Sequence, residues 1–204
     1  RYIAKTLMFA GAVGFSPIAS PDGLSYIGKH SEVGDFVHVM GQAVGIDGIH
    51  GATESSLSAT EKISLGHVQA DESFTQAKKR GLVQDVSRRN LLTDIGDCGA
   101  MGIAVIYELA RATGGVIVDL GLHLTKFVGI QPWQKQCSES QDRMVTISRP
   151  HNEPKIMGAG KVHGVDVTNL GELTNTGYAH ILHNGTTVGL VDLAKLNDSE
   201  PRMQ

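Results

Sequence analysis

The feature that most constrains the fold is a predicted β-hairpin near the C-terminus. Residues 178–183 and 186–193 each alternate between apolar and polar side chains, as a strand with one buried face does. Asn184-Gly185 separates the two runs, and this dipeptide is typical of a type I′ turn because both positions accept a positive φ. The chain therefore contains at least one antiparallel strand pair.

The rest of the chain mixes further strands with helices. Apolar and alternating runs predict strands over residues 35–40, 91–95, 116–120 and 142–148. Helical spacing predicts helices over 73–90, 103–112 and 152–157, the last weakened by Pro154, Gly158 and Gly160. Because hairpin strands occur here with helices outside a strict βαβ series, we expect an α+β fold, with helices packed on a mixed sheet.

Composition excludes several classes of protein. An apolar fraction of 41% in 204 residues is enough for a core, and the net charge of −3 argues against a nucleic-acid surface. The basic runs 78–80 and 88–89 fall in one polar segment, so we expect a solvated helix face there. Neither a membrane span nor a signal segment is visible, and two cysteines are too few for a disulfide framework. A cytoplasmic protein without membrane or nucleic-acid partners is expected.

A glycine-rich loop follows the strand predicted over 35–40. Residues 41–53 contain four glycines, whose N–H groups no Cβ obstructs, so the loop can form a concave nest for phosphate. The candidate phosphate-binding residues are Gly48, His50, Gly51 and Thr53. An ordinary long connection is the alternative, and the loop lacks the GK[ST] ending of a Walker A motif.

A polar run, Ser138-Glu139-Ser140-Gln141-Asp142-Arg143-Met144, leads into the strand predicted over 142–148. Its carboxylate and amide groups, with Gln69, offer partners for a hydroxyl-rich ligand in a lined cleft. A surface turn is the alternative for this run. For Arg143 two roles stay open, a guanidinium that binds phosphate through two N–H groups or a solvated charge.

Asp97 lies between a predicted strand and a predicted helix, just before Gly99-Ala100-Met101-Gly102. A carboxylate at such a junction can hold a Mg²⁺ ion that binds phosphates. The alternative is that Asp97 caps the helix N-terminus, which aspartate does well.

Several of these segments carry a resemblance to a known family. In order, they are Val44 to Thr53, Val68-Gln69, Leu92 to Ala100, Gly129-Ile130-Gln131-Pro132-Trp133, Ser138 to Met144 and Leu170 to Gly177. This ordered set resembles the synthetase component of the phosphoribosylformylglycinamidine synthase family. The Ser-Glu-Ser-Gln run separates that family from relatives of the same fold, such as aminoimidazole ribonucleotide synthetase.

The resemblance implies a fold and a division of the chain. Residues 35–204 would form a domain like the C-terminal domain of aminoimidazole ribonucleotide synthetase. Residues 1–34 would be a tail or linker from an N-terminal ATP-binding domain that this chain lacks. That missing domain holds the family's catalytic histidine and ATP-gripping lysine. We therefore expect no catalytic residue here, and no activity from the 204 residues alone.

The resemblance also implies an activity in purine biosynthesis. The family uses ATP, Mg²⁺ and ammonia derived from glutamine to convert formylglycinamide ribonucleotide into formylglycinamidine ribonucleotide. Carried over by motif, Gln69, Glu139, Ser140 and Gln141 would contact the ribonucleotide, and Asp97 would bind Mg²⁺. The partners implied are the ATP-binding domain of the same protein and a glutaminase domain or subunit.

Two other interpretations stay open because the chain departs from the family pattern. Glu54 replaces an aromatic residue, and Asp71-Glu72-Ser73 replaces Gly-Asp-Pro. These changes would fit a degenerate, non-catalytic homologue that keeps the fold for assembly. A free-standing phosphate-binding module is the third interpretation.

Overall fold

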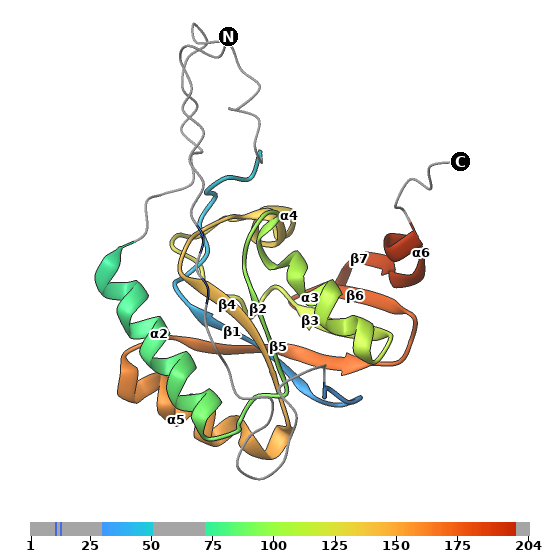
Figure 1. The fold of residues 1–204 in the computed structure, drawn as a ribbon. Coiled ribbons are helices and arrows are strands. Elements are labelled where there is room, and N and C mark those ends of the chain that lie inside the picture. The colour runs from blue at the N-terminus through green and yellow to red at the C-terminus, as the bar shows by residue number, and fades with distance from the viewer. Residues whose placement is uncertain (1–10, 12, 14–29, 51–71, 199–204) are drawn as a thin grey trace, which may run out of the picture.

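The computed structural model describes residues 11, 13, 30–50 and 72–198. Within them, one mixed β-sheet of seven strands carries five α-helices (Figure 1). The α+β fold expected from the sequence is therefore confirmed. The predictions for Gly51, Thr53 and Gln69 lie outside the described residues, as does Glu54.

The sheet has the strand order β2-β4-β1-β5-β3-β6-β7. Its strands are β1 (Phe36–Gly41), β2 (Asp94–Asp97), β3 (Gly115–Asp119), β4 (Arg143–Ser148), β5 (Val167–Thr174), β6 (Tyr178–His183) and β7 (Thr186–Asp192). Strands β3 and β6 pair in parallel, and the other neighbours are antiparallel. The parallel pair makes the sheet mixed, as expected.

The predicted hairpin is confirmed as β6 and β7. Asn184 and Gly185 have φ values of 51° and 76°, the left-handed conformation that a type I′ turn requires. Asp119, at the end of β3, accepts hydrogen bonds from both of their N–H groups, each at 2.8 Å. The turn is thereby anchored to the neighbouring parallel strand.

Helices cover both faces of the sheet (Figure 1). Helices α2 (Ser73–Arg88) and α5 (Glu153–His163) lie side by side on one face, where Leu82 and Ile156 pack with Met40 of β1. Helix α3 (Val105–Leu109) lies on the other face, over a larger core that includes Val37 and Val39 of β1. Alternate side chains of β1 thus enter different cores, as the pleat of a strand requires.

Two further short helices complete the described part. Helix α4 (Pro132–Cys137) precedes the polar run that begins at Ser138, and α6 (Leu193–Asp198) follows β7. Neither was predicted, because each is only six residues long and too short for a helical repeat to show in the sequence. No helix in residues 30–50 and 72–198 is long and apolar enough to cross a membrane.

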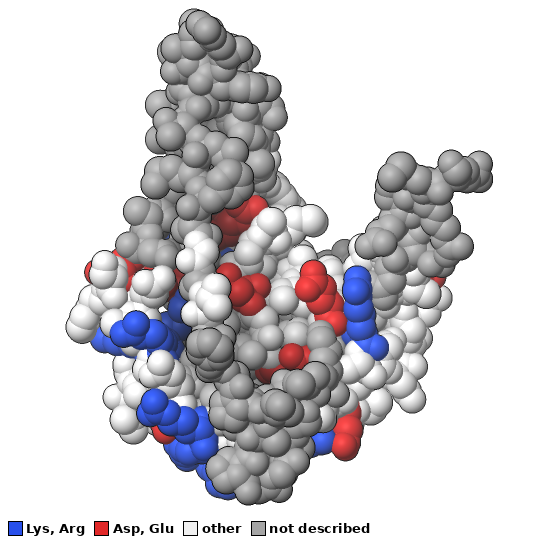
Figure 2. Space-filling model, in the orientation of Figure 1, with Lys and Arg blue, Asp and Glu red and all other residues white. Residues whose placement is uncertain are grey.

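The basic runs lie on α2, as expected. Residues 78–80 are inside the helix, and Arg88 and Arg89 lie at its C-terminal end. In Figure 2 most of the Lys and Arg side chains visible on this face gather over α2. Only Leu82 and Val86 of the helix are fully buried. The solvated face that we expected leaves out Lys79, however, whose side chain is 14% exposed and whose Nζ lies 3.6 Å from Oδ1 of the buried Asp142.

Three predicted elements differ from those observed. Helix α5 continues to His163 instead of ending near residue 157, because Pro154 lies in the first turn, where no backbone N–H is needed. Strand β2 begins at Asp94 rather than at Leu91, which is buried under α2 and α5. The helix predicted over 103–112 consists of α3 flanked by the 3₁₀ turns Gly102–Ala104 and Ala110–Ala112.

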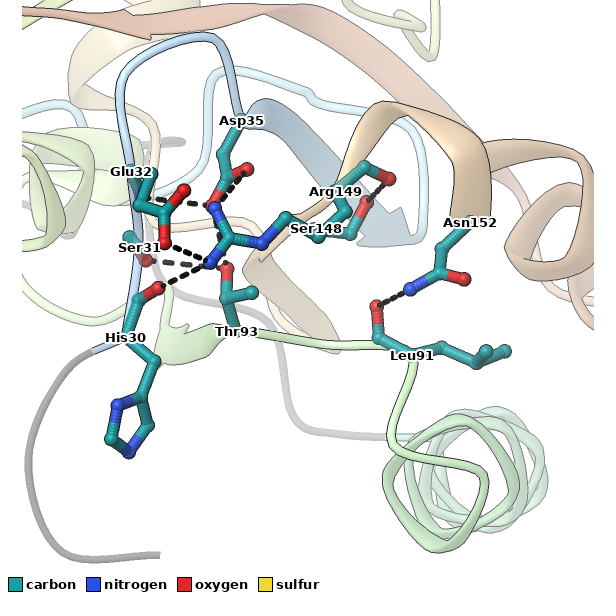
Figure 3. A network of polar contacts seen from close by, with 9 residues as sticks. All are labelled: His30, Ser31, Glu32, Asp35, Leu91, Thr93, Ser148, Arg149 and Asn152. Atoms are coloured by element: carbon teal, nitrogen blue, oxygen red, sulfur yellow. Dashed lines mark hydrogen bonds and ion pairs between the residues drawn. The ribbon is translucent and has the colours of Figure 1, made fainter. Parts of the chain in front are cut away.

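A polar network ties the segment before β1 to the sheet (Figure 3). Asp35 is buried and lies 3.0 Å from Nη1 of Arg149, while Nη2 of Arg149 donates to Glu32 at 2.6 Å. Thr93 donates to the same Asp35 carboxylate at 3.2 Å. Residues 30–35 are therefore packed on the sheet, and the division into a tail of 1–34 and a domain of 35–204 stays a prediction.

Candidate functional site

The Ser138–Arg143 run lies between α4 and β4, against the loop that follows β1. Ser138 and Ser140 have no exposed surface, and Arg143 is 1% exposed. Glu139 and Gln141, in contrast, are partly exposed. This alternation does not fit a surface turn, because it buries two hydroxyls, the Asp142 carboxylate and a guanidinium while Glu139 and Gln141 stay partly exposed.

Arg143 is buried and forms hydrogen bonds to the backbone of the run. Its Nε donates to the carbonyl of Ser140 at 2.8 Å, and its Nη2 donates to the carbonyl of Ser138. The guanidinium is thus neither a solvated charge nor exposed to a ligand. These two hydrogen bonds fix the backbone on both sides of Glu139 and thereby the position of its side chain.

Asp47 joins the glycine loop to the run. Its carboxylate accepts hydrogen bonds from the hydroxyl of Ser140 and from Nζ of Lys126, the latter at 2.8 Å. Its backbone carbonyl accepts the N–H of Glu139 at 2.7 Å. Burial alone would raise the pKa of Asp47, but the hydrogen bonds from Lys126 and Ser140 hold the pKa below its usual value.

Met101 and Gly102 approach the run from a third side. The N–H of Met101 donates to Oε1 of Glu139 at 3.2 Å. A Cβ on Gly102 would lie 2.2 Å from the carbonyl oxygen of Ser138, and its φ is +62°, so glycine is needed there for two reasons. This contact brings the segment just after Asp97 against the predicted substrate-binding residues.

Asp97 is the exposed last residue of β2 and lines a cavity of about 530 Å³ together with Glu108 and Arg111. It does not cap the helical segment, whose N-cap position is occupied by Met101. Among the described residues no group of three or more His, Cys, Asp or Glu side chains is placed to hold a metal ion. Two carboxylates on one cavity still suit Mg²⁺, which binds through one or two carboxylates plus water and phosphate oxygens.

The remaining predicted residues have different surroundings. Gly48 is buried in the turn after Asp47, with a φ of +61°, and His50 is exposed. Gln141 donates through Nε2 to the carbonyl of Glu139 at 2.9 Å. The hydroxyl of Ser140 is used within the chain, because it also accepts the N–H of Gly45 at 2.9 Å.

Sequence reasoning missed two buried polar side chains, His123 and Lys135. His123 is 4% exposed, and burial, with Arg143 and Lys135 nearby, lowers its pKa to about 3. Lys135 is also buried, and its Nζ donates to the carbonyl of Leu120 at 2.9 Å. No local pattern in the sequence indicates that these side chains are buried.

The fold and this arrangement place the chain in a recognisable class of domain. Residues 32–183 match the family described as AIR synthase related protein, C-terminal domain, and the chain belongs to this family. The resemblance to phosphoribosylformylglycinamidine synthase is confirmed as distant homology. The PurL subunit of this synthase from Moorella thermoacetica is 30% identical over 178 residues, covering 85% of this chain and 24% of PurL.

Solved structures agree with the fold. Thermotoga maritima PurL complexed with FGAR matches with a TM-score of 0.75 at 24% identity, over 82% of this chain and 28% of PurL. Escherichia coli HypE, a hydrogenase maturation protein, matches with a TM-score of 0.58 at 17% identity, over 83% of this chain and 54% of HypE. The chain spans about a quarter of the length of the curated relatives it matches.

Proposed function

We propose that this domain forms the substrate-binding wall of an ATP-dependent carbon–nitrogen ligase. The ligase would convert formylglycinamide ribonucleotide and ammonia into formylglycinamidine ribonucleotide. The observation that carries the proposal is that Ser138, Ser140 and Arg143 are buried in the run. Glu139 and Gln141, which alternate with them, stay partly exposed. Distant homology to PurL supports the reaction, and Thermotoga PurL complexed with FGAR supports the substrate.

In this proposal the domain binds and orients the ribonucleotide. The Gln141 amide and the Glu139 carboxylate hydrogen-bond the substrate, and Gln69 adds a second amide. Ser140 contributes through its backbone and through its bond to Asp47, because its hydroxyl is buried. Gly48, His50, Gly51 and Thr53 would bind the ribonucleotide phosphate.

The remaining parts of the reaction lie outside this chain. ATP and the catalytic residues belong to an ATP-binding domain of the same protein, and ammonia comes from a glutaminase domain or subunit. Asp97, with Glu108 on the same cavity, would hold Mg²⁺. The ion supplies positive charge that offsets the charge of phosphate oxygens. The protein is then expected in the cytoplasm.

The test is calorimetric titration of formylglycinamide ribonucleotide into the complete protein. Gln141→Ala and Glu139→Ala each remove one buried hydrogen bond to the ligand, worth roughly 1–3 kcal/mol. Each variant should therefore bind about 5- to 150-fold more weakly. Glu172→Ala, which removes an exposed carboxylate on β5, is the matched control and should bind as the wild type does.

Two outcomes would contradict the proposal. Wild-type affinity in both variants would remove Glu139 and Gln141 from the site. No binding by the wild-type protein would instead favour the non-catalytic homologue suggested by Glu54 and Asp71-Glu72-Ser73.

A further inference from the structure

Three segments that are distant in sequence meet at the carboxylate of Asp47. Ser140 reaches it from the polar run, and Lys126 reaches it from the loop before α4, with Nζ at 2.8 Å. That loop is paired with the chain beside Asp47, because Val44 and Thr125 form a parallel bridge. A single buried side chain therefore links the glycine loop, the 120–131 loop and the run.

The hydrogen-bond pattern fixes the direction of the Ser140 bond. The Ser140 hydroxyl accepts the N–H of Gly45 at 2.9 Å, and it donates its one proton to Asp47, because an ionised carboxylate can only accept. The Asp47 carboxylate is a strong acceptor for that proton, and the positive charge of Lys126 keeps it ionised. Removing the carboxylate would leave a buried hydroxyl and an ammonium group without this acceptor.

We propose that Asp47 is a positioning residue for substrate binding, which holds the Ser138–Gln141 run in the shape that presents Glu139 and Gln141 to the ribonucleotide. The inference rests on the proposed function, in which those two side chains bind the substrate. Asp47 contacts the run in two ways, through its carboxylate to Ser140 and through its carbonyl to the N–H of Glu139. One contact is at Glu139 itself and the other is at the next residue, so both hold the chain where the Glu139 side chain begins.

The first measurement is ribonucleotide affinity of the complete protein with Asp47→Ala. Its affinity should fall at least as far as that of Gln141→Ala, although Asp47 itself faces Ser140 and Lys126. The double variant Asp47→Ala/Gln141→Ala should bind no more weakly than Asp47→Ala alone, since the loss of Asp47 already disturbs the contact that Gln141 makes. Asp47→Asn, which keeps an oxygen acceptor for Ser140 but loses the charge beside Lys126, should restore part of the affinity.

Asp35→Ala is the matched control. Asp35 is also a buried carboxylate, it lies 3.0 Å from Nη1 of Arg149, and it precedes β1 whereas Asp47 follows it. Asp35→Ala should lower the melting temperature while leaving the affinity unchanged. Lys126→Met keeps the Asp47–Ser140 bond and should weaken binding less than Asp47→Ala. If Asp47→Ala fails to fold, Asp47→Asn takes its place and should still bind more weakly than the wild type.

The second measurement is amide hydrogen exchange without ligand. Asp47→Ala should speed exchange at Glu139 and at Met101, whose N–H donates to the Glu139 carboxylate at 3.2 Å. Wild-type exchange at both amides, or additive losses in the double variant, would overturn the positioning role. If exchange increases while Glu139→Ala and Gln141→Ala bind normally, Asp47 still shapes the run, but the proposed function fails.

Discussion

At the scale of single residues, the polar groups that shape the candidate site are buried ones. Arg143 spans the run and hydrogen-bonds two carbonyl groups, while Asp47 gathers Ser140 and Lys126. Buried charges are costly unless they are paired and hydrogen-bonded, so such groups stabilise one arrangement of the loops over others. The residues that we expect to touch the ligand are arranged on this buried framework.

Replacing Arg143 with methionine should destabilise the chain substantially. The variant loses two charge-assisted hydrogen bonds and leaves the carbonyls of Ser138 and Ser140 buried without that donor, at a cost of roughly 3 kcal/mol or more. Urea unfolding gives the free energy of unfolding directly. Arg111→Met, at an exposed arginine, is the control and should change it by less than about 0.5 kcal/mol. Equal effects of the two substitutions would contradict the structural role of Arg143.

His123 should make stability depend on pH. Its pKa is about 3 in the folded chain, whereas an unfolded histidine titrates near about 6.5. Between these values the unfolded chain binds the proton more strongly, so the free energy of unfolding falls as pH decreases from about 6.5 toward 3. His123→Leu should lose less stability than the wild type between pH 7 and pH 4.5 in urea titrations. Identical losses would show that His123 does not contribute.

Sequence alone could nominate some site residues but not their roles. Glu139, Ser140 and Gln141 stood out as a run, yet the burial of Ser140 depends on a loop 93 residues away. Asp47 has a local signal, because it lies between Gly45 and Gly48 in the loop that predicts a phosphate nest. That signal does not indicate a contact with Ser140. The burial of Arg143 and of His123 has no local signal, because only tertiary contacts bury such polar side chains.

At the scale of elements, the sequence predicted best where local pattern determines structure. The β6–β7 hairpin follows from alternation and from Asn184-Gly185, both visible in a short window. Strand β5 was missed although it lies between β1 and β3. It contains Asn169 and Gly171, and the register of β5 against β1 shifts between Val37 and His38. An irregular strand of this kind forms because its neighbours offer hydrogen bonds, not because of its own pattern.

Helix α5 allows a sharp comparison between two glycines. Gly158 is exposed and a Cβ there would meet nothing within 4 Å, so Gly158→Ala should raise the free energy of unfolding by about 0.5–1 kcal/mol. Gly160 is buried, and a Cβ would lie 2.7 Å from Cγ2 of Val167 and 2.9 Å from the carbonyl of Val165. Gly160→Ala should therefore lower stability. Thermal or urea unfolding of the pair checks this, and a stabilising Gly160→Ala would contradict the packing of α5 on β5.

At the scale of the whole molecule, the fold class and the family could both be anticipated. The α+β class followed from mixing a hairpin with helices, and the family followed from the ordered motifs. The family model now covers residues 32–183. The order of the strands could not be derived, because it depends on which edges pair across long loops. The substrate and Mg²⁺ assignments depend on the rest of the protein and remain proposals.

The central claim is that the glycine loop and the polar run act as one ribonucleotide-binding wall. Hydrogen–deuterium exchange of the complete protein, with and without formylglycinamide ribonucleotide, tests it most directly. We predict slower exchange in residues 45–50 and 138–141 when the ribonucleotide is bound, and no change in the β6–β7 hairpin. Bound ribonucleotide that leaves both segments unprotected would contradict the account.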